Sequence, residues 1–299
     1  MRGRFAQLER DLAAAAWAAE AVQVRFSGQN LRSVAMELSG RVVVVTGGAG
    51  GLGAALCRRF ANDGASVVVT DLDQARCDAV AAEVGGLGVA TDVCDEEAVG
   101  RLVLEVTDRV GPIDLFHSNA GGGSGPGGVF ADDGTWTDAW RVNVMASVYA
   151  ARAVLPAMLE RGEGYLLGTA SGAALTCEPG NPAYSVTKHA MLDLYELLAI
   201  EYGGRGIRVS CFCPFGMLTP MLLGAAADGP TAAVPASVEI GLRGAVTPEF
   251  AADVVAEGVR DERFLILSHP EALTYFSRKA GDYDRWIKGM QRAYRPTPG

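Results

Sequence analysis

The sequence predicts an α/β protein whose core is a doubly wound, seven-stranded parallel sheet with helices on both faces. Two observations lead to this prediction. From Arg41 onward, short runs rich in Val, Ile and Leu alternate with longer, Ala-rich amphipathic runs, as they do in successive β-α-β units. Directly after the first apolar run, a cluster of glycines provides the turn that such a unit needs between its strand and its helix.

The short apolar runs are the expected strands, because buried parallel strands read as nearly continuous aliphatic runs. They lie near residues 41–46, 66–71, 87–90, 113–118, 164–170, 206–213 and 263–267. The longer runs between them are the expected helices. They lie near residues 51–63, 74–84, 95–110, 133–161, 181–203 and 247–260. Seven strands joined by six crossovers make one sheet, whose ligands bind beyond the carboxyl ends of the strands.

Both ends of the chain lie outside this alternation, which predicts a single core domain at residues 40–268. Residues 1–39 are an expected N-terminal extension, helical from about Phe5 to Val24, and Met36 is an alternative start of the chain. Residues 269–299 are an expected C-terminal tail. Its scattered aromatic residues either cap a pocket or cross a subunit interface.

Composition argues against several classes of protein. The 26 Lys and Arg against 35 Asp and Glu give a net charge of −9 without a basic tract, so nucleic acid is not an expected partner. The six cysteines match no zinc pattern, so we expect no metal and interpret them as buried thiols in a reducing cytoplasm. No apolar stretch reaches about 18 residues, so no membrane partner is expected.

The turn after the first strand has the residues of a dinucleotide-binding site. In the run from Thr46 to Gly53, Gly47, Gly51 and Gly53 let the backbone approach a pyrophosphate, and the N–H groups at the helix start, including that of Leu52, face it. A tight structural turn is the alternative interpretation.

The end of the second strand favours the cofactor interpretation. Asp71 follows the last glycine by 71 − 53 = 18 residues, near the spacing of an acid that binds the adenosine ribose. Its carboxylate would repel a 2′-phosphate, and no Lys or Arg lies within the turn. NAD(H) is therefore the expected cofactor.

The next two strands also end in residues suited to a nucleotide. Asp92 and Val93 end the third strand, where they are expected to contact the adenine edge. Asn119, Ala120 and Gly121 end the fourth, where small side chains allow the cofactor to lie close. Each of these is also compatible with an ordinary turn, but their common register behind one glycine-rich turn favours the cofactor.

Tyr184 and Lys188 are four positions apart on an expected helix, so a phenol and an ammonium share one face. A neighbouring cation favours the phenolate and lowers the pKa of the tyrosine toward neutral pH, which suits a general acid or base. Ser171 ends the fifth strand, 184 − 171 = 13 residues before Tyr184. Two unrelated surface residues would give the same spacing.

Taken in order, Thr-Gly-x-x-x-Gly-x-Gly, Asn-Ala-Gly, Ser and Tyr-x-x-x-Lys resemble the short-chain dehydrogenase/reductase family over about residues 38–268. The resemblance implies a Rossmann-type domain that transfers hydride between nicotinamide and an alcohol or carbonyl. It implies that Tyr184 is the general acid/base, that Lys188 binds the nicotinamide ribose and that Ser171 orients the substrate oxygen. It also implies that Asn143 kinks the helix near 133–161 and holds a water of the proton relay.

After the sixth strand the chain departs from the Pro-Gly of that family, because Phe215 follows Pro214. The resemblance still implies that Thr219 contacts the carboxamide of the cofactor, with Pro214 and the backbone of Met217 as further contacts.

The apolar segment at about 215–244 is expected to be a substrate lid, and the glycines at 121–128 a loop at the site rim. Thr176, Cys177 and Glu178 are expected to line the opposite wall. The apolar lid favours a hydrophobic secondary alcohol or its ketone as the small-molecule substrate.

Alternatives to an NAD-dependent alcohol dehydrogenase are an NADPH-dependent carbonyl reductase and a non-catalytic nucleotide-binding scaffold. By analogy with the family, the long helices near 133–161 and 181–203 are expected to pair between subunits in a homodimer or homotetramer.

Overall fold

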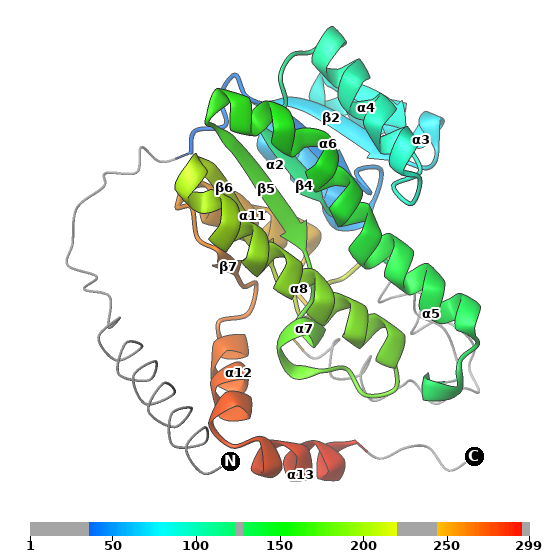
Figure 1. Cartoon of the computed structure of the whole chain (residues 1–299), viewed down its shortest axis with the longest axis vertical. Helices are drawn as coiled ribbons and strands as arrows, with labels where there is room; N and C mark the ends of the chain where they lie inside the picture. Colours follow the sequence, from blue (N-terminus) through cyan, green and yellow to red (C-terminus); the bar gives the residue numbers. More distant parts are fainter. Residues whose placement is uncertain (1–35, 123–127, 220–243, 295–299) are drawn as a thin grey trace, which may run out of the picture. The chain divides into compact units, whose positions relative to one another are not determined.

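Among the residues that the structure describes, which are 36–122, 128–219 and 244–294, seven strands form one parallel sheet in this computed structural model (Figure 1). The strands are β1 Val42–Thr46, β2 Ser66–Asp71, β3 Leu87–Ala90, β4 Leu115–Ser118, β5 Gly164–Thr169, β6 Ile207–Phe212 and β7 Leu265–Ile266. Their order is β3-β2-β1-β4-β5-β6-β7, and every neighbouring pair is parallel. The order reverses between β1 and β4, so the predicted doubly wound sheet is confirmed.

Helices connect the strands and cover both faces of the sheet (Figure 1). They are α2 Gly51–Asn62, α3 Gln74–Val84, α4 Glu96–Arg109, α5 Asp133–Trp140, α6 Ala146–Arg161, α7 Ala173–Thr176, α8 Pro182–Tyr202, α11 Pro248–Arg260, α12 Glu271–Gly281 and α13 Tyr283–Ala293. Side chains at their starts fix several boundaries. Asp73, Asp95 and Thr247 each accept a hydrogen bond from a backbone N–H in the first turn of α3, α4 and α11.

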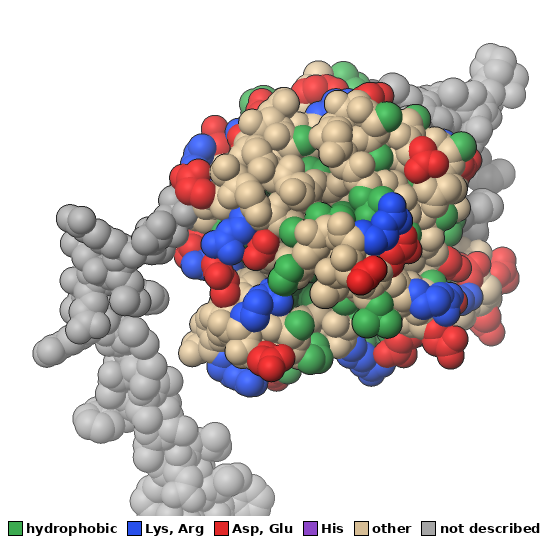
Figure 2. Space-filling model, turned by 90° about the horizontal axis from the view of Figure 1, so that it is seen from above, with side chains coloured by type: hydrophobic (Ala, Val, Ile, Leu, Met, Phe, Trp, Pro, Cys, Tyr) green, Lys and Arg blue, Asp and Glu red, His purple; other side chains and the backbone are tan. Residues whose placement is uncertain are grey.

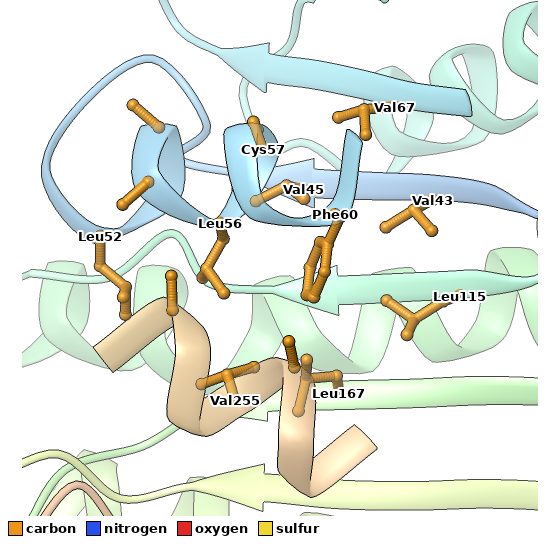
Figure 3. Close-up of a cluster of buried hydrophobic side chains, with 14 of the residues drawn as sticks. Val43, Val45, Leu52, Leu56, Cys57, Phe60, Val67, Leu115, Leu167 and Val255 are labelled. Atoms are coloured by element: carbon orange, nitrogen blue, oxygen red, sulfur yellow. The ribbon is translucent and has the colours of Figure 1, made fainter. Parts of the chain in front are cut away.

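The core has two layers, one on each face of the sheet. In the first, α2 and α11 pack on the strands, and Phe60 of α2 is completely buried between them (Figure 3). Truncating Phe60 to Ala would cost about 3–5 kcal/mol of stability. In the second, α4, α6 and α8 cover the opposite face through side chains such as Met158 and Met191. Because both faces are covered, β1 consists of four consecutive buried valines and a threonine.

The helix expected near 133–161 is interrupted. Residues Arg141–Met145 form one π-helical turn between α5 and α6, and this turn contains Asn143. By length and composition, the stretch Asp133–Arg161 is apolar enough to cross a membrane, yet half of its most apolar window is buried in the protein. The contacts of α6 with α4, β4 and β5 identify it as a core helix.

Within the expected C-terminal tail at 269–299, the structure forms α12 and α13. One expectation needs correction. The cysteines are not all buried: Cys57, Cys77, Cys211 and Cys213 are, Cys94 is half-buried and Cys177 is exposed.

Some predictions fall outside the described residues. These are the helix from Phe5 to Val24, most of the lid at 215–244 and the glycines at 123–127 of the rim loop. Met36 and Leu38 already belong to the core, but the predicted division of the chain into domains stays a prediction.

Charges of both signs are interspersed over the described residues on the face shown in Figure 2. Ion pairs such as Arg58 with Glu83 and Arg152 with Glu96 join opposite charges on neighbouring helices. On this face, the described residues therefore form no extended basic stripe of the kind that follows a phosphate backbone.

Candidate active site

In the turn between β1 and α2, two parts of the backbone lie so close together that only glycine fits between them. Gly47 has φ +64°, a conformation that other residues rarely adopt, and a Cβ on Gly53 would lie 2.0 Å from the oxygen of Gly47. Helix α2 begins at Gly51 without a side chain capping its first turn, while the side chain of Leu52 is buried in the core. The free N–H groups of this turn suit a pyrophosphate.

Asp71 ends β2 and holds the same turn. Its Oδ2 accepts a hydrogen bond from the N–H of Ala49 at 3.2 Å, and its Oδ1 accepts one from Leu72 at 2.8 Å. The guanidinium of Arg76 donates from Nη2 to the oxygen of Ala49 at 3.2 Å. Sequence reasoning missed Arg76, because it considered only the turn and the residue after Asp71. Arg76 lies in the first turn of α3, 76 − 71 = 5 positions after Asp71, and this turn places its guanidinium next to the glycine-rich turn.

Thr46 connects the glycine-rich turn to the end of β4. Its Oγ1 accepts hydrogen bonds from the N–H groups of Asn119 at 2.9 Å and Ala120 at 3.0 Å. The side-chain amide of Asn119 donates to the main-chain oxygen of Thr46 at 2.9 Å. The predicted residues at the ends of β1 and β4 are thus tied together at the strand-order reversal, where this class of sheet binds its ligand.

Asp92 and Val93 follow the third strand at the same edge of the sheet. Val93 and Ala120 line a small apolar cavity of about 10 Å³ near the end of β4. The side chain of Asp92 is exposed, and its Oδ1 accepts a hydrogen bond from the N–H of Cys94 at 2.8 Å. The tight turn at Gly47 and Gly53, the uncapped helix start and the acid at Asp71 together fit a dinucleotide.

Tyr184 lies in the first turn of α8 and is half-buried at the carboxyl edge of the sheet. Burial raises the pKa of Tyr184 to about 12, and the nearby side chain of Ser171 only partly offsets this. The charge of Glu178 raises the pKa further. The sequence predicted that Lys188 would lower this pKa toward neutral; in the structure, burial is the largest influence on it and raises it.

Lys188 is 3% exposed, and its Nζ donates to the main-chain oxygen of Thr169 at 2.8 Å. Burial lowers the pKa of Lys188 to about 8. The ammonium lies 5.7 Å from the ring centre of Tyr184, so the pair shares one face as predicted. A Cβ on Gly121 would lie 2.9 Å from Nζ, so only a glycine leaves this space open.

The hydroxyl of Thr169 also connects the end of β5, where Lys188 is held, to the end of β4. Nε2 of His117 lies 2.8 Å from Oγ1 of Thr169, which in turn donates to Oδ1 of Asn119 at 3.2 Å. His117 must therefore donate to Thr169, so its proton is on Nε2. Its Nδ1 is buried without a partner among the described residues. No local sequence pattern predicts this chain of hydrogen bonds, because it depends on the register of β4 and β5.

Asn143 is 1% exposed within the π turn. Its Nδ2 donates to the oxygen of Gly122 at 2.7 Å and to Oγ1 of Thr187 at 3.0 Å, and its Oδ1 accepts from the N–H of Gly122 at 3.2 Å. Asn143 thus holds the strand-end loop against α8. A kink was predicted at this residue; the structure has a π turn there, which interrupts the regular α-helical pattern.

The segment after β6, where Phe215 departs from the family pattern, packs against the residue that follows Ser171. The oxygen of Pro214 accepts from the N–H of Gly172 at 2.6 Å, and the ring of Phe215 packs on Gly172, where a Cβ would lie 2.5 Å from it. Met217 forms a bridge with Val246, and the N–H of Thr219 donates to the oxygen of Met217 at 2.8 Å. Phe215 therefore braces the neighbour of Ser171.

Comparison with known proteins agrees with this geometry. Residues 41–228 match the family model described as short chain dehydrogenase. The chain is 35% identical to short chain aldehyde dehydrogenase 1 of Euphorbia lathyris over 62% of its length and 66% of that protein. It is 37% identical to 1-deoxy-11-beta-hydroxypentalenate dehydrogenase of Streptomyces exfoliatus over 79% of its length and 86% of that protein.

A solved structure supports the same comparison. A short chain dehydrogenase/reductase from Burkholderia phymatum, in complex with NAD, superimposes with a TM-score of 0.75 at 26% identity. The match covers 88% of this chain and 99% of that one.

Proposed function

The chain belongs to the short-chain dehydrogenase family, and from this we propose that it is an NAD(H)-dependent oxidoreductase that interconverts a secondary, hydrophobic alcohol and its ketone. The observation that carries the proposal is the meeting of Tyr184, Ser171 and Lys188 at the carboxyl edge of the sheet, beside a turn that fits a dinucleotide. Membership of the family alone leaves the substrate open, since the relatives named above are an aldehyde dehydrogenase and a hydroxypentalenate dehydrogenase.

The chemistry follows from the properties of these side chains. The hydroxyls of Ser171 and Tyr184 hold the substrate oxygen, and Tyr184 accepts the alcohol proton in oxidation or donates it in reduction. The ammonium of Lys188 stabilises the phenolate through its charge. When bound, the nicotinamide ring supplies the hydride acceptor or donor. Asn143 keeps the loop at Gly122 in place against the helix of Tyr184.

Asp71 supports NAD(H) over NADP(H). Its carboxylate lies at the end of β2, where it would accept the ribose hydroxyls and repel a 2′-phosphate. Gly47, Gly51, Gly53, Asp92, Val93, Asn119, Ala120, Gly121, Pro214, Met217 and Thr219 are the further proposed contacts with the cofactor. Arg76 favours the alternative, an NADPH-linked carbonyl reductase, because its guanidinium lies on the same turn.

Replacing Tyr184 tests the proposal. Tyr184→Phe should lower turnover by about 10²–10⁴-fold and leave NADH binding, followed by fluorescence, within about twofold. Tyr202→Phe, a phenol near the other end of the same helix, is the matched control. Full activity in Tyr184→Phe would exclude it as the acid/base. Tight NADH binding by the wild type without NADH formation or consumption on a broad alcohol and ketone panel would favour the scaffold alternative.

We further propose that α6 and α8 pair with a second copy of the chain in a homodimer or homotetramer. An open apolar groove of about 370 Å³ runs along these helices, and its walls include Leu155, Leu159, Leu194 and Leu198. Leu194→Arg should shift the mass measured by sedimentation toward the monomer. An unchanged mass would argue against this face as the interface. The cytoplasmic location stays a prediction.

A further inference from the structure

A buried lysine joins the C-terminal part of the chain to the region of the active site. Lys279 lies on α12, beyond the residues 41–228 that match the family model, and is 6% exposed. Its Nζ donates to the oxygen of Leu175 at 3.0 Å and lies 3.3 Å from Nε2 of His189 and 3.9 Å from Sγ of Cys177. These three acceptors belong to α7, to the residue that follows it and to α8.

The hydrogen-bond directions around this ammonium are determined. Nδ1 of His189 lies 3.0 Å from the oxygen of Ser185, to which only an N–H can donate, so Nε2 accepts from Lys279. Among the described residues, no carboxylate lies within 4.0 Å of this ammonium, and the ring of Tyr283 is 5.8 Å away. A buried cation without a counter-ion is costly unless its donors are satisfied. Its position is therefore set by these acceptors.

The acceptors lie on both sides of the strained turn that ends α7. Cys177 has φ +78°, in the left-handed region that a side chain disfavours. The contacts of Lys279 with the oxygen of Leu175 and the sulfur of Cys177 span this turn. The turn begins a few residues after Ser171 and leads to Glu178, whose charge acts on Tyr184. It therefore forms the wall beside the two groups that would hold the substrate oxygen.

The same C-terminal segment supports two more parts of the site. The ring of Tyr275 on α12 lies 6.5 Å from that of Phe215, which packs on Gly172 next to Ser171. Nε2 of His269 lies 2.7 Å from the oxygen of Gly244, where the chain re-enters the described structure after residues 220–243. The segment from His269 to Lys279 thus contacts the turn after α7, Phe215 beside Gly172, and Gly244.

We propose that Lys279 is a positioning residue for substrate: it fixes the wall at Thr176–Glu178 against the helix that carries Tyr184. The proposal rests on the proposed oxidoreductase function. Lys279 touches neither cofactor nor reacting atoms, so its effect is on how the apolar part of the substrate is held. An apolar substrate is recognised by shape, and a wall that moves loses that recognition.

Lys279→Met in the full-length chain removes the ammonium and keeps most of the side-chain volume. We expect the KM for the alcohol or ketone to rise about tenfold, with kcat lowered less than about threefold and NADH affinity unchanged. Lys288→Met, an exposed lysine on α13, is the matched control and should change neither constant. Lys279→Arg should restore part of the loss. An unchanged KM in Lys279→Met would overturn the proposal.

A second readout does not depend on any substrate. The N–H groups of Thr176 and Cys177 donate to the oxygens of Gly172 and Ala173, both at 3.0 Å. Hydrogen exchange at these two amides should be about tenfold faster in Lys279→Met, with exchange in β1 unchanged. Equal exchange in both proteins would overturn the proposal, even if the wild type proved inactive and the proposed function failed.

Should Lys279→Met not fold, His189→Leu tests the same contact from the other side. It removes one acceptor of the ammonium and should accelerate exchange at Thr176 and Cys177 and raise the KM. Normal exchange and KM in His189→Leu would then reject the proposal.

Discussion

Lys188 donates from Nζ to the main-chain oxygen of Thr169 at 2.8 Å, so a buried ammonium is anchored to the last residue of β5. Burial lowers the pKa of Lys188 from 10.5 to about 8, because the charged form has left water with a carbonyl as its main partner. Protonated at neutral pH, it therefore destabilises the fold. A buried lysine that lowers stability fits a chemical role for Lys188, since residues needed for activity often reduce the stability of the fold.

Replacing Lys188 should separate stability from activity. Lys188→Met should raise the free energy of unfolding at pH 7 by about 1–3 kcal/mol in urea denaturation, while turnover falls by about 10²-fold or more. The sign follows from linkage. The pKa of Lys188 is about 8 in the folded protein and 10.5 in the unfolded chain, so the stability of the wild type rises with pH between these values. The difference in free energy of unfolding between Lys188→Met and the wild type therefore becomes smaller over this range. A less stable Lys188→Met protein at pH 7 would contradict the burial argument.

The rates in the two directions should depend on pH with opposite signs. With the pKa of Tyr184 at about 12, the phenol is protonated at neutral pH and ready to donate in ketone reduction. Alcohol oxidation needs the phenolate, so kcat/KM for oxidation should rise with pH. The rise should end at about 8, where Lys188 loses the charge that stabilises the phenolate. Reduction should fall above about 8, where Lys188 loses its proton. Stopped-flow rates across this range test both slopes, and a pH-independent oxidation rate would argue against Tyr184 as the base.

Asp71 and Arg76 should control the choice of cofactor together. Asp71→Asn keeps the shape of the side chain and removes its charge, so we expect the ratio of kcat/KM for NADH over NADPH to fall by about 10–100-fold. In the double variant with Arg76→Met, kcat/KM for NADPH should fall back toward the wild-type value. The reason is that the guanidinium that could bind the 2′-phosphate is then missing. Arg58→Met, an exposed arginine on α2 paired with Glu83, is the control. A wild type that prefers NADPH would refute the assignment of NAD.

His117 should make the fold sensitive to acid. Burial lowers the pKa of His117 from 6.5 to about 3, so the unfolded chain binds a proton that the folded chain excludes. Its contribution is present above pH 6.5 and is lost as pH falls toward about 3, at up to about 1.4 kcal/mol per unit. His117→Leu should flatten the dependence of unfolding free energy on pH between about 5 and about 6.5. Thr169→Val removes the hydrogen bonds of this hydroxyl with His117 and Asn119 but leaves the imidazole in place, so it should keep the slope.

The parts of the molecule that the sequence predicted well are those with strong local signals. A run of valines closed by glycines identifies β1 and its turn, and Asp73 and Asp95 mark the starts of two helices. Asn143 is a poor helix former in the middle of an expected helix, and the π turn contains this residue. Each of these signals follows from the chemistry of a few neighbouring residues.

The rest depends on contacts between distant segments. The oxygen of Thr169 that accepts from Lys188 is a backbone atom, so the residue type at position 169 does not predict this contact. The link from His117 to Thr169 exists only because β4 and β5 pair in one register. Burial raised the pKa of Tyr184 where a neighbouring charge was expected to lower it. The acceptors of Lys279 lie about 90 residues or more away, so its role had no local signal.

The strand order also sets the sequence in which the two halves can fold as the ribosome releases the chain. Val44 of β1 pairs with Val68 of β2, a separation of 68 − 44 = 24 residues, and with Phe116 of β4, a separation of 116 − 44 = 72. Loop closure over the shorter distance costs less entropy, and its partner is synthesised first. The pairing of β1 with β2 can therefore form while the residues of α8 and α12 are still unmade, whereas the core layer that α2 shares with α11 is completed only near the end of synthesis.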